Sequence, residues 1–136
     1  MSKLRFAIVA ILFSFIGGCQ EDDTASNSEK NKLMVQEIWE ISSDTEVGQI
    51  GAQLRFYEDG RAQVRESATS NWYATYLTWS LSDDGEYLTM NGTDGPGTMD
   101  KLQILELTSS LFRGKIVSST STSAIGKISK MFKAVQ

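Results

Sequence analysis

Residues 54–65 read Leu-Arg-Phe-Tyr-Glu-Asp-Gly-Arg-Ala-Gln-Val-Arg. Apolar and polar side chains alternate on both sides of the central Glu58-Asp59-Gly60. Successive side chains of a strand point to opposite faces, so each half fits a strand with one buried face. Asp-Gly is a favoured hairpin turn, because glycine adopts the positive φ that such a turn requires. The stretch therefore predicts an antiparallel hairpin.

The same rhythm of short apolar runs and Gly, Asp, Asn or Ser turns continues on both sides of this hairpin. It predicts eight strands, at residues 35–43, 50–57, 61–67, 71–81, 86–91, 98–107, 111–118 and 125–135. Short connections between neighbours are typical of a meander. We therefore predict an all-β fold, an eight-stranded up-and-down antiparallel β-barrel, whose interior holds side chains or one small ligand.

Three details of the barrel are open to test. Residues 29–36 favour a short helix before the first strand. Residues 125–135 also fit a helix, but a strand is preferred because it would cover the edge of the sheet. Broken alternation at residues 104–107 indicates a β-bulge. The residues predicted to be mostly buried are Leu54, Phe56, Val64, Leu77, Trp79, Leu88, Met90, Ile104 and Phe132.

The N-terminal residues have the order of an export signal. Lys3 and Arg5 precede an apolar run that ends on Ile16-Gly17-Gly18, directly before Cys19, the one cysteine of the chain. This order is typical of a secretory signal. The alternative is a transmembrane anchor, for which the run is shorter than the about 20 apolar residues required. We expect a signal at residues 1–18, a disordered acidic tether at 19–32 and the barrel domain at 33–136.

Composition argues against most catalytic and nucleic-acid functions. The chain has no histidine and a formal net charge of −4. Histidine is the commonest general base and metal ligand, so we expect no enzyme, no metal and no cofactor. Nucleic-acid binding requires basic patches, which an acidic chain does not favour. The acidic turns 83–85 and 91–95 are explained as turn chemistry rather than as a calcium site.

Two sets of motifs resemble known families. The cysteine after the apolar run resembles a bacterial lipoprotein signal, which implies that Cys19 is acylated and holds the protein in the outer membrane. The chain also resembles the lipocalin-like domain of small Bacteroidota lipoproteins, in the Trp39 strand, the 54–60 hairpin, the 79–88 hairpin, residues 104–108 and the ending 131–133. This resemblance covers residues 33–136 and implies a barrel that binds a small apolar or amphipathic ligand.

Two functions remain open at this point. In a ligand-binding barrel, we expect the inward side chains Phe56, Leu77, Trp79 and Met90 to bind the ligand. In a filled barrel that acts as an adaptor, Trp72 and Tyr76 would share the opposite face of the long strand 71–81 and bind an envelope protein. An interior void of several hundred cubic ångströms would favour the first function.

Overall fold

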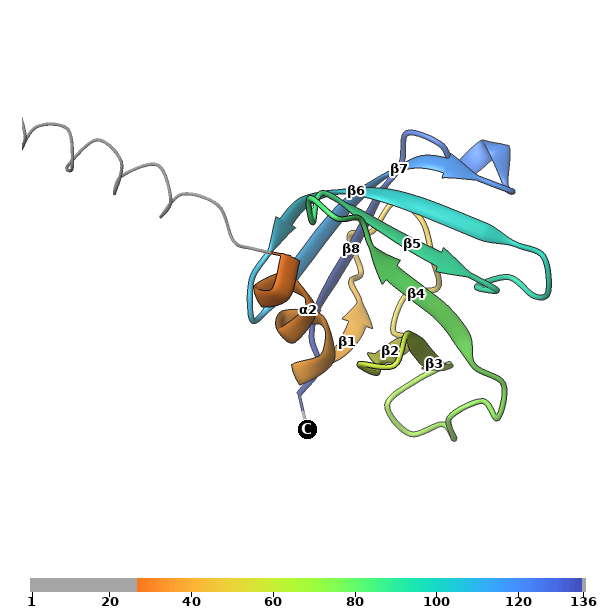
Figure 1. Cartoon of the computed structure of the whole chain (residues 1–136). Coiled ribbons are helices and arrows are strands. Elements are labelled where there is room, and N and C mark those ends of the chain that lie inside the picture. Colours follow the sequence, from red (N-terminus) through yellow and green to blue (C-terminus); the bar gives the residue numbers. More distant parts are fainter. Residues whose placement is uncertain (1–26, 136) are drawn as a thin grey trace, which may run out of the picture.

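The computed structural model describes residues 27–135. Signal, cleavage site and lipid attachment at Cys19 lie outside the described residues. The described chain forms one closed barrel of eight antiparallel strands, each paired with its neighbours in sequence order (Figure 1). The predicted all-β, up-and-down barrel is confirmed.

Most strands are shorter than the sequence predicts, whereas β7 and the helix are slightly longer. They are α2 (Asn27–Gln36), β1 (Ile38–Ile41), β2 (Gln53–Phe56), β3 (Arg61–Arg65), β4 (Leu77–Leu81), β5 (Tyr87–Asn91), β6 (Met99–Leu107), β7 (Leu111–Ser119), the 3-10 turn η1 (Thr122–Ala124) and β8 (Ile128–Lys133). The C-terminal segment is a strand, as preferred, and β8 closes the barrel on β1. The register of β6 and β7 shifts between Ile104 and Glu106, which confirms the predicted bulge.

Helix α2 covers one end of the barrel. The expected short helix is present, but it begins at Asn27, so residues 27–32 are helical and not tether. The Asn27 side chain donates to the Ser82 carbonyl, and the Lys30 ammonium donates to the Gly85 carbonyl at 2.8 Å. Met34 is fully buried in the core. Figure 1 shows α2 against this end, where the C-terminus also emerges. We call it the α2 end.

The opposite end carries the four longer connections, residues 42–52, 66–76, 92–98 and 120–127. We call this end the mouth. Because the strands run up and down, only the three short turns at 57–60, 82–86 and 108–110 lie at the α2 end. Gly60, with φ of +86°, occupies the predicted hairpin turn. Among the described residues, no helix has the length and apolar character needed to cross a membrane.

Inward side chains of the strands form the core. Of the nine residues predicted to be buried, six are, and Val64 and Ile104 are half-buried against the core. Phe132 is half-buried as well, but it does not belong to the core. Its neighbour Met131 points inward and is 2% exposed, while Phe132 is half-buried on the other face. Because Met131 and Phe132 are both apolar, the sequence alone does not show which of them faces the core. In the structure Met131 pairs with Ile41 and Phe112, and it is Met131 that points inward.

Candidate functional site

A cavity of about 380 Å³ opens at the mouth of the barrel. Its deep wall is apolar and comes from six strands, with Leu54, Val64, Met90, Leu102, Ile116 and Met131. Its outer wall comes from the mouth connections and contributes Val47, Gln49, Tyr73, Thr93 and Asp94. Ligand pockets usually measure about 300–1,000 Å³, with an apolar lining and a few polar groups. The cavity has the size and lining of a site for one small molecule.

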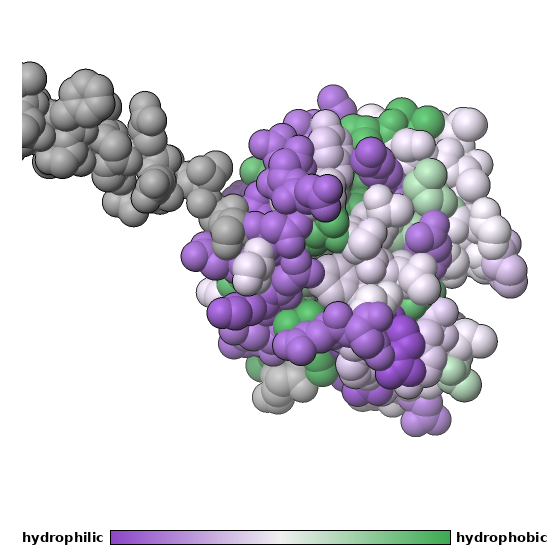
Figure 2. Space-filling view, viewed as in Figure 1, coloured by the Kyte–Doolittle hydropathy of each residue, from purple (hydrophilic) through white to green (hydrophobic). Residues whose placement is uncertain are grey.

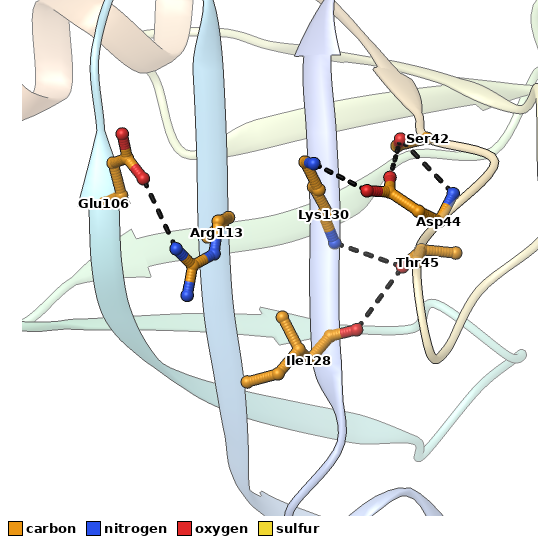
Figure 3. A network of polar contacts seen from close by, with 7 residues as sticks. All are labelled: Ser42, Asp44, Thr45, Glu106, Arg113, Ile128 and Lys130. Atoms are coloured by element: carbon orange, nitrogen blue, oxygen red, sulfur yellow. Dashed lines mark hydrogen bonds and ion pairs between the residues drawn. The ribbon is translucent and has the colours of Figure 1, made fainter.

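The connection 42–52 forms one side of the cavity. Hydrogen bonds and an ion pair join it to β8 (Figure 3). The Ser42 amide donates to the Lys130 carbonyl, and the Lys130 ammonium lies 2.7 Å from the Asp44 carboxylate. Hydrogen bonds from Lys130 and from the Ser42 hydroxyl hold the pKa of Asp44 below its usual value. The Lys130 amide also donates to the Thr45 hydroxyl at 3.1 Å. These contacts fix the backbone that carries Val47, Gly48 and Gln49 into the cavity wall.

Tyr73, in the next connection around the barrel (residues 66–76), also lines the cavity. Its amide donates to the Val64 carbonyl at 2.9 Å, and its own carbonyl accepts from the Gln63 side chain. The phenol donates to the Glu66 carboxylate at 2.6 Å, and this bond raises the pKa of Tyr73. Tyr73 is 47% exposed, so it lies at the rim of the cavity, and its hydroxyl is already hydrogen-bonded to Glu66.

Only one of the four predicted ligand-binding residues lines the cavity. Met90 does, whereas Phe56, Leu77 and Trp79 do not. Phe56 and Trp79 pack edge to face, with ring centroids 5.3 Å apart, and the Trp79 indole N–H donates to the Tyr57 carbonyl. All three residues point inward, as expected, but they fill the barrel interior outside the cavity.

The prediction that Trp72 and Tyr76 share one face of a strand is wrong. Strand β4 begins only at Leu77, and residues 71–76 belong to the mouth connection. This connection lies over the outer face of β2 and β3, because Gln63 holds Tyr73 there. The Trp72 ring is stacked on Arg55 and Arg65, at 4.3 and 4.4 Å from the guanidinium carbons. Tyr76 is exposed and stacks on Arg61 at 4.5 Å.

This arginine–aromatic layer explains two buried polar residues. Gln53 and Gln63 face outward, yet they are only 1% and 6% exposed. Arg65 donates to the Gln53 side chain and Arg55 to the Gln63 side chain, each through two N–H groups. The layer satisfies its own hydrogen bonds. Figure 2 shows hydrophobic residues in separate patches on the face that carries α2.

The sequence analysis missed Asp100, which also lines the cavity. The sequence alone drew attention only to acidic residues in turns and in the tether. Asp100 is half-buried on β6, two residues before the buried Leu102. Residues two apart in a strand lie on the same face, so this spacing from Leu102 could have shown that Asp100 points inward. Among the described residues, no three His, Cys, Asp or Glu side chains gather in a group that could hold a metal ion.

The chain matches no family model, and comparisons with curated proteins and with solved structures return no match. The functional argument therefore rests on the cavity and its lining.

Proposed function

We propose that this protein is a lipid-anchored, lipocalin-like barrel that binds one small apolar or amphipathic ligand at its mouth. The observation that carries the proposal is the cavity of about 380 Å³, because a barrel filled by its own side chains would leave no such space. Burial of apolar ligand surface against the deep wall supplies the binding energy, at about 25 cal/mol per Å². The polar groups of the rim orient the ligand.

The adaptor alternative has less support. It requires exposed aromatic anchors, but Trp72 is half-buried and stacked on two guanidinium groups, and the exposed Tyr76 is stacked on Arg61. Interface anchors are normally aromatic side chains free to enter a pocket on the partner. An envelope partner would have to displace the arginines or bind to them.

A cavity-filling substitution tests the proposal. We expect Ala52→Leu, at a buried position in the cavity wall, to place its new carbons in existing space and to abolish binding of the neutral fluorescent probe N-phenyl-1-naphthylamine. Its free energy of unfolding should stay close to that of the unmodified chain. The matched control is Ala62→Leu, which adds the same atoms at a fully buried position outside the cavity. Overpacking should lower the stability of this variant by about 1–3 kcal/mol, while the folded fraction still binds the probe.

Probe fluorescence and urea denaturation measure the two effects. No binding by the unmodified chain, or equal destabilisation by both substitutions, would show that the mouth is packed and would refute the ligand-binding proposal.

The lipid anchor has a separate test. We expect Cys19→Ala to remove the protein from the membrane fraction and from the detergent phase in phase partitioning, because the thiol is the acylation site in this proposal. Stable anchoring by acyl chains takes at least two of them, which a diacylated cysteine supplies. Gln20→Ala is the control and should stay in the detergent phase. A Cys19→Ala variant that still partitions with detergent would favour a transmembrane anchor instead.

A further inference from the structure

Asp100 is a carboxylate at an inward position of the barrel. On one side it pairs with Met90 of β5, and on the other side with Ser119 of β7. Residues directly opposite each other on neighbouring strands point to the same face of a sheet. Met90 is buried and lines the cavity, so Asp100 also points into the barrel, at the level of the mouth.

Two hydroxyl groups hold this carboxylate in place. Thr93 donates to one oxygen at 2.9 Å, and Ser119 donates to the other at 2.5 Å. A carboxylate offers about four acceptor positions, so these two bonds leave capacity for a further donor. Asp100 is half-buried, and its carboxylate is a preformed hydrogen-bond acceptor on the polar side of an apolar cavity.

The lining of the cavity contains no lysine and no arginine. Its charged groups are Asp100 and Asp94, the latter exposed at the rim. The neighbouring Lys101 does not balance them, because its ammonium lies over the Tyr87 ring, 4.8 Å from the centroid, and it is not among the lining residues. Tyr73 keeps its proton at neutral pH, because its bond to Glu66 raises its pKa. The mouth therefore presents negative charge to any ligand that enters.

We propose that the cavity selects ligands that carry a cationic ammonium head group on an apolar body, and that it discriminates against ligands ending in a carboxylate. This inference rests on the proposed ligand-binding function. The apolar body would lie against Leu102 and Ile116, while the ammonium would lie beside Asp100 at the mouth. Opposite charges in a partly desolvated site attract, and a second carboxylate beside Asp100 would be repelled.

Three probes with the same chain length separate the effect of ligand charge on affinity from the effect of apolar burial. At pH 7 octylammonium is cationic, octanoate is anionic and 1-octanol is neutral, because amines of this kind titrate near 10 and carboxyls near 4. Binding to the full chain is followed through the ¹³C-labelled methyl groups of methionine. Met90 and Met131 line the cavity, whereas Met34 lies in α2 and serves as an internal control.

We expect octylammonium to shift the Met90 and Met131 signals, to leave Met34 unchanged, and to bind about tenfold more tightly than octanoate, with octanol between them. Asp100→Asn keeps the shape of the side chain and removes its charge. It should bring the three affinities to within about threefold of one another. Asp83→Asn makes the same charge change in an exposed turn at the α2 end and should retain the preference.

The outcomes distinguish the two proposals. If all three probes shift Met90 and Met131 with equal affinity, or if octanoate binds best, the charge inference is overturned and the cavity remains a ligand site. If none of the probes shifts these methyl groups, both proposals fail. An Asp100→Asn variant that keeps the full preference for ammonium would assign the selection to another group.

Discussion

Replacing Trp39 with alanine is expected to lower the free energy of unfolding by about 3–5 kcal/mol, the largest effect we predict for a single substitution. Trp39 is the largest side chain that is fully buried, and it lies on β1 between Leu54 of β2 and Lys133 of β8. Its indole N–H donates to the Met34 carbonyl at 3.0 Å. Truncation therefore leaves both a cavity and an unpaired buried carbonyl where α2 joins the barrel.

Trp39→Phe separates these two contributions. It keeps most of the buried ring surface and removes the N–H donor, so it should lower the free energy of unfolding clearly less than Trp39→Ala does. Trp72→Ala is the control for loss of an indole, since Trp72 is half-buried outside the barrel and its cation–π contacts are worth about 1 kcal/mol in total. Guanidinium denaturation gives the three values. Equal losses for Trp39→Ala and Trp72→Ala would contradict this account of the core.

The second large effect is expected at Gly114 of β7. A Cβ added there would lie 2.9 Å from the ring tip of Phe112 and 3.1 Å from a Leu102 methyl group. Valine favours strands, so at an open position the change from glycine would stabilise the sheet. At Gly114 the overpacking outweighs this gain, so Gly114→Val should lower the free energy of unfolding by about 3 kcal/mol.

Two further variants test the cause of that loss. Lys115→Val introduces the same side chain at the adjacent, exposed position and should change stability by no more than about 0.5 kcal/mol. In the Phe112→Leu background the ring tip is absent, so Gly114→Val should cost less than in the unmodified chain. A double-mutant cycle from denaturation curves measures this coupling. Additive losses would show that Phe112 is not the obstacle.

Local patterns were sufficient to predict the number, order and pairing of the strands. The Glu58-Asp59-Gly60 turn and the alternation on either side define a hairpin without reference to the rest of the chain. The aromatic run 71–76 gave a wrong strand, because its residues alternate as a strand would. Their place is set instead by a tertiary contact, in which Gln63 holds the Tyr73 carbonyl over the outer face of β2 and β3.

The site was less predictable than the fold, for a geometric reason. Alternation indicates whether a side chain points inward, and Phe56, Leu77, Trp79 and Met90 do. It does not indicate the height of that residue along the barrel axis, which depends on the tilt and stagger of all the strands together. Only Met90 reaches the cavity. Asp100 was missed because acidic residues are usually exposed, although its spacing from Leu102 placed it on the inner face.

The pairing of β1 with β8 has a consequence for the kinetics of folding. Glu40 lies opposite Phe132, so the last seam joins residues from nearly the two extremes of the domain, whereas every other pair of strands is adjacent in sequence. Closing so long a loop has a high entropic cost before its contacts form, and barrels with such distant contacts fold on the millisecond-to-second timescale. Strands β1 and β8 also supply Ile41, Ser129 and Met131 to the cavity wall. The cavity is therefore complete only once this seam has closed, and under the ligand-binding proposal a bound ligand would retard its reopening rather than hasten its formation.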